Sequence, residues 1–336
     1  MRGMLGIVGS VLLLMACNGG DGDGDGDGDG GGSGRVAAPA SCLSADCGSK
    51  QRLVDIPGAE NLFFTDAGRL FVTGNDNIYE LLSTSGGYVA QPRSAGTAGG
   101  SGFGGIAQRG NVLYVNVFDD GGLWAAELND APEFSLIHAM GLASPNGLSD
   151  GPDGELYVVN GPLIAVAGLP DPKVVRLRFA PEDAMQVVEQ VDWLALPGLQ
   201  PNGIARRGRS LFISASRLLP PSPGLLLRVE IAADGQASEP EVLLEFNSIP
   251  DDLSVAGDAL LLSFFSEGAI ALVSDRGELL SRSAAQSFDS PSQLRMGRPP
   301  LFDPRDVLVT EKGLLLANPS SYGNALSIFR RHRGGG

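Results

Sequence analysis

The 336-residue chain is poor in cysteine, histidine and aromatic residues, with three Cys, two His and 6% Phe, Trp and Tyr. The few cysteines leave Cys42 and Cys47 without a second pair to complete a structural zinc site. His138 lies in a β-like run and His332 in the tail, which disfavours a histidine acid or base in catalysis. No Gly-x-Ser-x-Gly motif is present, so a serine nucleophile of the hydrolase type has no support.

Basic residues are also scarce, because 24 Lys and Arg stand against 39 Asp and Glu, for a formal net charge of −15. Binding to nucleic acid needs clustered Lys and Arg against the phosphates, so nucleic acid is disfavoured as a partner. Long amphipathic helices are lacking as well: the segment VEQVDWLAL is the best helical candidate, and it is short.

The N-terminal apolar run, Leu5 to Met15, is too short to span a bilayer as a helix and has the length of a signal-peptide core. It ends in Leu-Met-Ala-Cys, which resembles the lipobox of bacterial lipoproteins. The resemblance implies a signal peptide over residues 1–16 and a lipidated Cys17, whose acyl chains anchor the protein in a bacterial membrane. Asn18 at the next position implies the outer membrane. The alternative is an ordinary secretory signal with an incidental cysteine.

Alternating Asp and Gly residues fill the segment after this signal, so residues 17–40 are predicted to form a flexible, self-repelling tether. Cys42 and Cys47 follow in SCLSADC. An exported chain meets an oxidising compartment, which favours a small disulfide loop over half of a metal site. We therefore expect one folded domain over residues 41–332 and a glycine tail over 333–336.

Six segments repeat one order of features: a small or polar pair, an apolar residue, a turn with glycine, and an apolar strand. The apolar residues after the pairs are 42 to 56 positions apart and are Leu62, Ile106, Leu148, Ile204, Leu253 and Val307. Repeats of about 40 to 50 residues with three or four strands predict a β-propeller. The expected fold is therefore an all-β, six-bladed β-propeller, in which QRLVDI or ALSIFRR closes the last blade against the first.

Residues just ahead of the inner strands of a propeller converge on one mouth of its central channel. The residues two positions before the six apolar anchors are Glu60, Gly104, Asn146, Asn202, Asp251 and Arg305. Four of them, Glu60, Asn146, Asn202 and Asp251, offer two carboxylates and two amide oxygens, which are the hard ligands that calcium prefers. The sequence therefore predicts a central divalent-metal site, with calcium ahead of zinc or manganese.

The tripeptide Pro-Asn-Gly precedes a strand twice, at Pro145 and at Pro201. The proline stiffens the entry, and the glycine permits unusual backbone conformations and leaves space at a crowded mouth. The alternative is turn chemistry alone, because Asn and Asp hydrogen-bond their own backbone.

The repeat and the ring resemble the superfamily of gluconolactonases, regucalcin (senescence marker protein) and paraoxonases, which are six-bladed β-propellers. The resemblance spans about Arg52 to Arg331, and the motifs that carry it are AEN at Ala59, PNG at Pro145 and Pro201, and PDD at Pro250. In the gluconolactonase branch a Glu, two Asn and an Asp hold one metal, so the resemblance implies this role for Glu60, Asn146, Asn202 and Asp251. The chain departs from the paraoxonases at Gly104, where it offers no histidine.

A metal-dependent lactone or ester hydrolase is the activity that the resemblance implies. Asp251, or its neighbour Asp252, would take a proton from water. Arg305 is expected on the same mouth, where it would steer an anionic substrate or hold a developing oxyanion. The alternative for this arginine is a structural pair with Asp303 or Asp306.

A second function fits the same residues, namely a non-catalytic propeller of the cell envelope that binds a glycan or a protein. The missing histidine, the tether and the bare position Gly104 favour it. For either function we expect a monomer that touches the membrane only through its lipid anchor.

Overall fold

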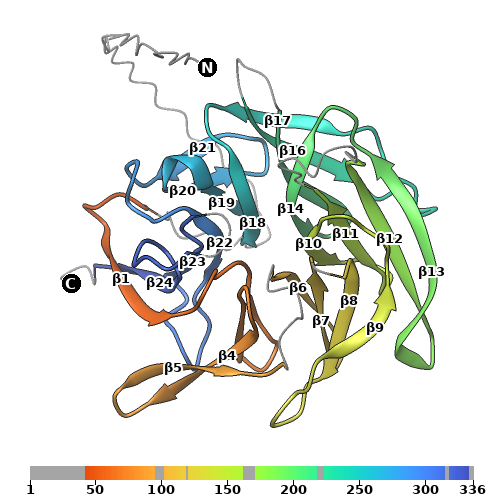
Figure 1. The fold of residues 1–336 in the computed structure, drawn as a ribbon. Coiled ribbons are helices and arrows are strands. Elements are labelled where there is room, and N and C mark those ends of the chain that lie inside the picture. The colour runs from red at the N-terminus through yellow and green to blue at the C-terminus, as the bar shows by residue number, and fades with distance from the viewer. Residues whose placement is uncertain are drawn as a thin grey trace, which may run out of the picture. The chain divides into compact units, whose positions relative to one another are not determined.

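Six four-stranded antiparallel sheets make up the described part of the chain in a computed structural model (Figure 1). The described residues are 42–94, 102–118, 120–161, 171–217, 223–314 and 318–332, and they belong to one compact unit, Ala38–Gly336. The first strands of neighbouring sheets lie next to one another, and the sheets extend outward from them like blades (Figure 1). The expected six-bladed β-propeller is therefore confirmed.

Each blade consists of four strands in order from the inner to the outer edge. The first three blades contain β2 (Leu62–Phe64), β3 (Leu70–Thr73), β4 (Ile78–Thr84) and β5 (Gly87–Pro92); β6 (Phe103–Arg109), β7 (Val112–Val117), β8 (Gly122–Glu127) and β9 (Ser135–Ala139); and β10 (Pro145–Asp150), β11 (Leu156–Asn160), β12 (Lys173–Ala180) and β13 (Asp183–Ala195).

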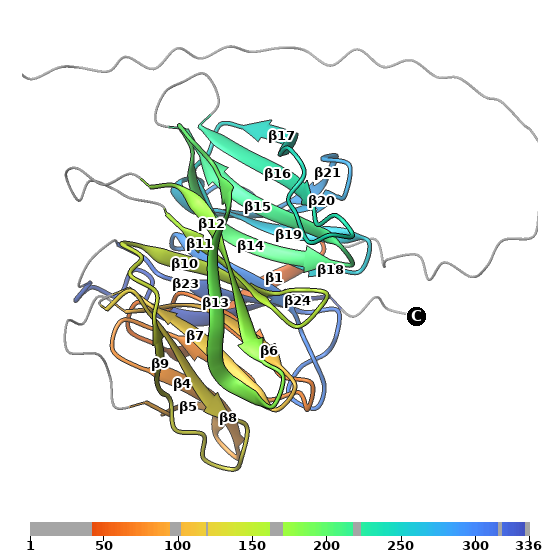
Figure 2. The ribbon, with the colours of Figure 1, turned by 90° about the vertical axis from the view of Figure 1, so that its right-hand side faces the viewer.

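The last three blades follow the same plan, except that the sixth takes its outer strand from the N-terminal side of the chain. They contain β14 (Gln200–Arg207), β15 (Ser210–Ser216), β16 (Gly224–Glu230) and β17 (Glu241–Phe246); β18 (Pro250–Ala256), β19 (Ala259–Phe264), β20 (Ala269–Ser274) and β21 (Leu279–Arg282); and β22 (Pro291–Met296), β23 (Val307–Glu311), β24 (Ala325–Arg331) and β1 (Gly48–Asp55). Seen from the side, β14 to β17 lie one beyond the other (Figure 2).

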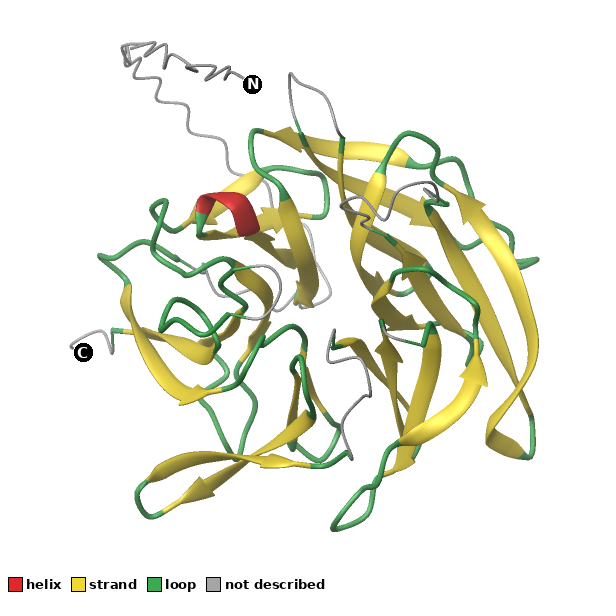
Figure 3. Cartoon of the chain, viewed as in Figure 1, coloured by secondary structure: helices red, strands yellow, loops and turns green. Residues whose placement is uncertain are grey.

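Helical structure in the described ranges is limited to one 3₁₀ turn, η1 (Phe265–Glu267), between β19 and β20 (Figure 3). The segment VEQVDWLAL lies mostly in strand β13. In this part of the chain no helix is long and apolar enough to cross a membrane. The predicted signal peptide (1–16), the tether (17–40), the lipidation site Cys17 and the tail (333–336) lie outside the described residues.

The propeller is closed in its sixth blade, where β1 pairs antiparallel with β24 from Gly48 opposite Arg331 to Asp55 opposite Ala325. Both segments that the sequence offered for closure therefore take part in it. Lys50 Nζ donates to the buried carboxylate of Glu311 in β23 (2.5 Å) and ties the outer strand to the blade. Just before β1, Cys42 and Cys47 form a disulfide, and Leu43 between them is buried in the core between the fifth and sixth blades.

The hydrophobic core is divided into six clusters, one in each gap between neighbouring blades. Strand β15 shows how alternation produces this division: Leu211 and Ile213 pack toward the third blade, whereas Phe212 packs toward the fifth. Full burial of each such side chain contributes about 1.5–3 kcal/mol. Because every blade needs neighbours on both faces, the blades stabilise one another as a closed set.

A β-bulge near the start of the inner strand recurs around the propeller. In the third blade Pro145 pairs with Asn160 and Leu148 with Val158, so Asn146 and Gly147 together oppose Val159. The same shift of register occurs in β6, β14, β18 and β22. In the first blade, Thr73 accepts from the Glu60 N–H (2.8 Å) and donates its own N–H to the Asn61 carbonyl (2.8 Å), which gives the same two-to-one arrangement.

Side chains opposite these bulges connect one blade to the next. Thr73 Oγ1 donates to the Gly104 carbonyl (2.9 Å) and Asn116 Nδ2 to the Asn146 carbonyl (2.6 Å). Ser214 Oγ donates in the same way to the Asp251 carbonyl, and Thr310 Oγ1 to the Glu60 carbonyl (2.6 Å). In four blades, therefore, a buried polar side chain fixes the backbone of the first bulge residue in the following blade.

The sixth repeat unit was placed wrongly by the sequence pattern. Val307 begins the second strand, β23, and the inner strand is β22. The first bulge residue of this blade is therefore Ser292, and the apolar residue is Leu294. The pattern misled because VLVTE in β23 is as apolar as an inner strand and also follows a turn-rich segment, DPRD.

The glycines of the two Pro-Asn-Gly motifs, Gly147 and Gly203, have backbone angles outside the left-handed region, so the expected unusual backbone conformation is wrong. These two positions require glycine because there is no space for a side chain. A Cβ on Gly147 would lie 2.6 Å from the Asn202 carbonyl oxygen, and one on Gly203 would lie 2.6 Å from Asp252 Cα. Each glycine therefore lets the bulge of the next blade approach closely.

Replacing Gly203 by alanine should destabilise the protein by about 1–3 kcal/mol, because the new methyl overlaps the bulge of the fifth blade. Gly86→Ala is the control, since a Cβ there has no atom within 4 Å. Thermal unfolding of both variants would measure the effect. A melting temperature for Gly203→Ala as high as that of the control would contradict the packing argument.

Candidate functional site

The ring positions are the first bulge residues of the six blades, namely Glu60, Gly104, Asn146, Asn202, Asp251 and Ser292. All the side chains among them are buried. Asn202 Nδ2 donates to Asp251 Oδ1, and the charges of Glu60 and Asp251 interact. The structure therefore brings Glu60, Asn202 and Asp251 together from the first, fourth and fifth blades.

The two ring asparagines each keep a buried amide oxygen without a hydrogen-bond donor. Asn146 Oδ1 and Asn202 Oδ1 are inaccessible to solvent and have no partner in the described structure. The two residues are 5% and 7% exposed. A buried acceptor without a donor costs about 1–3 kcal/mol, so these two oxygens are suited to a ligand that supplies positive charge.

Glu60 is already engaged by a lysine that the repeat pattern did not reveal. Lys312 Nζ donates to Glu60 Oε2 in an ion pair whose two side chains are 14% and 4% exposed. Lys312 directly follows β23, which ends beside the start of β22 because Glu311 pairs with Pro291. The cation that the sixth blade contributes to the ring is thus Lys312.

Arg305, predicted on this mouth, is wrongly placed by the sequence. It precedes β23, whose first residue Val307 pairs with Met296 at the end of β22, so Arg305 lies at the opposite end of the blade. Its guanidinium is about half exposed and forms a bidentate pair with Asp303 (3.0 and 2.7 Å). Arg305 therefore forms the structural pair with Asp303 that the sequence offered as its alternative role.

Burial governs the protonation of Asp251. Burial, and after it the charge of the nearby Glu60, raise the pKa of Asp251 to about 8, although Lys312 and the Ser292 hydroxyl act to lower it. A carboxyl with such a pKa is partly protonated near neutral pH. Asp251 can therefore accept or hold a proton in the range where a general base is effective.

Burial is also the main cause that raises the pKa of the neighbouring Asp252 to about 7. The Leu253 N–H and the charge of Arg295 act in the opposite direction and lower it. Both of its oxygens have donors: the Leu253 N–H donates to Oδ1 (2.7 Å) and Gln293 Nε2 to Oδ2 (3.0 Å). Gln293 in turn accepts the Leu62 N–H (2.8 Å). Asp252 thus links the fifth, sixth and first blades, and Asp251 is the better candidate for a base.

The ring differs from a site made of His, Cys, Asp and Glu. Across the described residues, no group of three or more of these side chains is arranged to hold a metal ion. Metal binding here would depend on the amide oxygens of Asn146 and Asn202 together with the carboxylates of Glu60 and Asp251. This donor set fits a hard divalent cation. Such a cation would compete with Lys312 for the carboxylate of Glu60.

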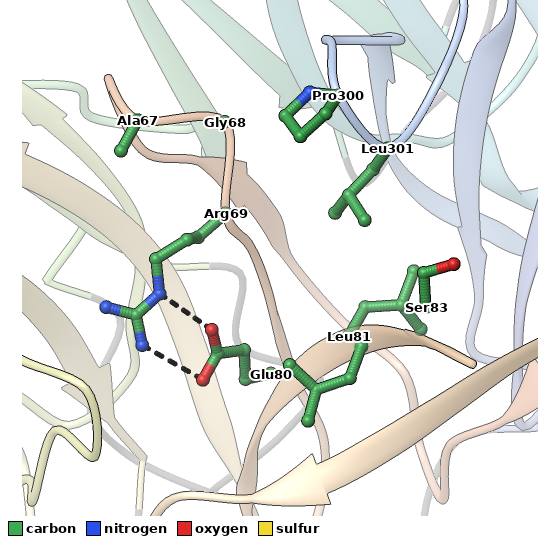
Figure 4. Close-up of a pocket in the computed structure, with 9 residues that line it drawn as sticks. Ala67, Gly68, Arg69, Glu80, Leu81, Ser83, Pro300 and Leu301 are labelled. Carbon is green, nitrogen blue, oxygen red and sulfur yellow. Dashed lines mark hydrogen bonds and ion pairs between the residues drawn. The ribbon is translucent and has the colours of Figure 1, made fainter.

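A hollow of about 150 Å³ lies between residues 67–83 of the first blade and Pro300 and Leu301 (Figure 4). Its polar wall is Glu80, which Arg69 binds through two nitrogens (2.7 and 3.0 Å) and Arg93 through a third (2.8 Å). Burial favours the neutral acid, but the arginines outweigh it and lower the pKa of Glu80. Both oxygens of the Glu80 carboxylate are engaged by these arginines, so this hollow is a packing feature. His138 has a similar structural role, because Nε2 lies 2.8 Å from Gln190 Oε1 of the next blade.

No protein-family model and no curated protein sequence matches the chain. Solved structures do match. A calcium-binding protein, regucalcin, from Agrobacterium tumefaciens is 17% identical with a TM-score of 0.59, over 84% of this chain and 93% of that one. An auxiliary nutrient binding protein from Bacteroides thetaiotaomicron is 12% identical with a TM-score of 0.58, over 82% and 70%.

The PQQ-bound aldose sugar dehydrogenase of Streptomyces coelicolor is 12% identical with a TM-score of 0.53, over 84% of this chain and 97% of that one. At such low identity these likenesses show the fold. The protein is therefore a six-bladed β-propeller similar in fold to regucalcin, with a buried polar ring at one end of its inner strands.

In the presence of a chelator, the free energy of unfolding should fall as pH rises from about 5 to about 8. Folding raises the pKa of Asp251 to about 8 and of Asp252 to about 7, from the ordinary value of 3.8. The folded state therefore holds protons that the unfolded chain has released, and stability is lost as pH rises through the folded pKa values. Each carboxyl contributes a slope of up to about 1.4 kcal/mol per pH unit.

Urea unfolding at several pH values in EDTA would measure this slope. Asp251→Asn removes one titrating carboxyl at constant shape, so its slope should be shallower than that of the wild type. A protein whose stability rises over this window would contradict the burial argument.

Proposed function

We propose that the ring binds one divalent cation, with calcium favoured over zinc and manganese, and that Glu60, Asn146, Asn202 and Asp251 hold it. The buried amide oxygens of Asn146 and Asn202, for which the described residues supply no donor, are the observation that carries the proposal. The two carboxylates would compensate the charge of the ion. The fold-level similarity to a regucalcin described as calcium-binding is consistent with it.

We further propose that the ring hydrolyses a lactone or an ester. A bound divalent ion would polarise the substrate carbonyl as a Lewis acid. Asp251, as a carboxylate at the ion, would accept the proton from the attacking water. Asn202, through its Nδ2 bond to Asp251 Oδ1, would orient that carboxylate. Arg305 takes no part, since it lies at the other end of the sixth blade.

Asp251→Asn should weaken calcium binding by about tenfold or more and reduce turnover of aldonolactones or aryl esters. The substitution keeps the shape of the side chain but removes the charge of a ligand and the proton acceptor. Calorimetry with calcium, zinc and manganese and a panel of these substrates would measure both effects. Arg305→Ala is the control and should change neither. Unchanged metal affinity and turnover in Asp251→Asn would refute the proposal.

A second candidate is a non-catalytic propeller that binds a glycan or a protein partner of the cell envelope. The bare ring position Gly104 favours it, because the second blade gives the ring no functional side chain. The fold-level similarity to a nutrient binding protein is consistent with it. Calcium binding by the wild type without turnover of any substrate in the panel would favour this candidate over the hydrolase.

We propose that the protein is a monomer of the bacterial cell envelope, anchored through Cys17 in the outer membrane. Its motif Leu-Met-Ala-Cys and the tether that follows support this location. The protein should fractionate with the outer membrane and carry acyl chains on Cys17, and Cys17→Ser should lose both properties. Mass spectrometry of the N-terminal peptide and membrane fractionation would test this. A wild-type protein without acyl chains would contradict it.

A further inference from the structure

Lys312 is held at the ring by its backbone as well as by its side chain. Its N–H donates to the Ser290 carbonyl (3.1 Å), and the N–H of the following residue, Gly313, donates to the Asp289 carbonyl (3.0 Å). These bonds fix the segment beside the start of β22. The side chain then crosses from the sixth blade to Glu60 in the first. The ammonium is therefore a built part of the ring.

The charge of Lys312 acts on more than one ring residue. Besides its ion pair with Glu60, it attracts the carboxylate of Asp251. These are the two carboxylates that the proposed metal site needs. A buried carboxylate without a counter-charge is strongly destabilising, so in the absence of a metal the ammonium compensates Glu60, its partner in the ion pair. A divalent ion would have to bind a carboxylate whose Oε2 already accepts from Lys312.

We propose that Lys312 is the resident cation of the ring and determines its affinity for metal ions. The ammonium holds Glu60 when no metal is bound and competes with a divalent ion for the same carboxylate. This inference rests on the metal-binding half of the proposed function and adds a residue that weakens binding.

The test is calcium binding to the full-length protein after removal of metal with EDTA. Lys312→Met removes the ammonium but keeps the aliphatic stem, and Lys312→Gln keeps a hydrogen-bond donor without the charge. Both variants should bind calcium about tenfold more tightly than the wild type or better. Without metal both should melt at a lower temperature than the wild type, and calcium should raise their melting temperature by more. The second variant keeps the test valid if the first does not fold.

Lys50→Met is the matched control. It removes an equal charge and an equivalent lysine–glutamate ion pair from the same blade, but its partner is Glu311, outside the ring positions. The affinity for calcium should therefore not change in this variant. A gain in affinity equal to that of Lys312→Met would mean that net charge alone is responsible and would overturn the inference.

The results separate this inference from the proposed function. Calcium affinity that is unchanged or weaker in both Lys312 variants overturns the role of the lysine, even if the wild type hydrolyses lactones. Tighter binding in both variants supports it, even if no substrate is turned over. If the wild type and both variants bind no calcium, zinc or manganese, the inference and the metal site fall together.

Discussion

The β-bulge at the start of each inner strand is the constraint on which the site depends. It places two residues opposite one, and in four blades a buried hydroxyl or amide of the preceding blade donates to the carbonyl of the first of these two residues. The inner strands are thus fixed to one another at the height of the ring. The ring positions owe their convergence to this backbone arrangement, whatever side chains they carry, as Gly104 and Ser292 show.

The ring combines carboxylates that burial disfavours with amide oxygens that have no donors. Neither is a stable arrangement by itself, because buried charges and buried unpaired acceptors both cost free energy. Part of this cost is offset inside the structure, by Lys312 at Glu60 and by Asn202 Nδ2 at Asp251. The remaining acceptors, Asn146 Oδ1 and Asn202 Oδ1, are the part of the ring that nothing in the described chain compensates.

Much of the ring was predictable because its motifs repeat. Proline followed by two bulge residues and an apolar residue occurs at Pro145, Pro201 and Pro250, and the same order at Pro291 would have identified Ser292. Competition from the equally apolar strand β23 concealed it. Lys312 carried no such signal. It follows the second strand of its blade and reaches Glu60 across 252 residues of sequence, so only the closure of the propeller brings the two together.

The sequence alone determined the architecture, because six repeats of alternating apolar strands can bury their side chains only against neighbouring blades. It also determined which oxygen-bearing residues occupy the ring in the first, third, fourth and fifth blades. The tertiary structure decided the register of the sixth blade. It also decided that Lys312, and not Arg305, lies at the ring. These depend on which strand faces the axis and on contacts between the first and last blades, and local sequence patterns contain neither.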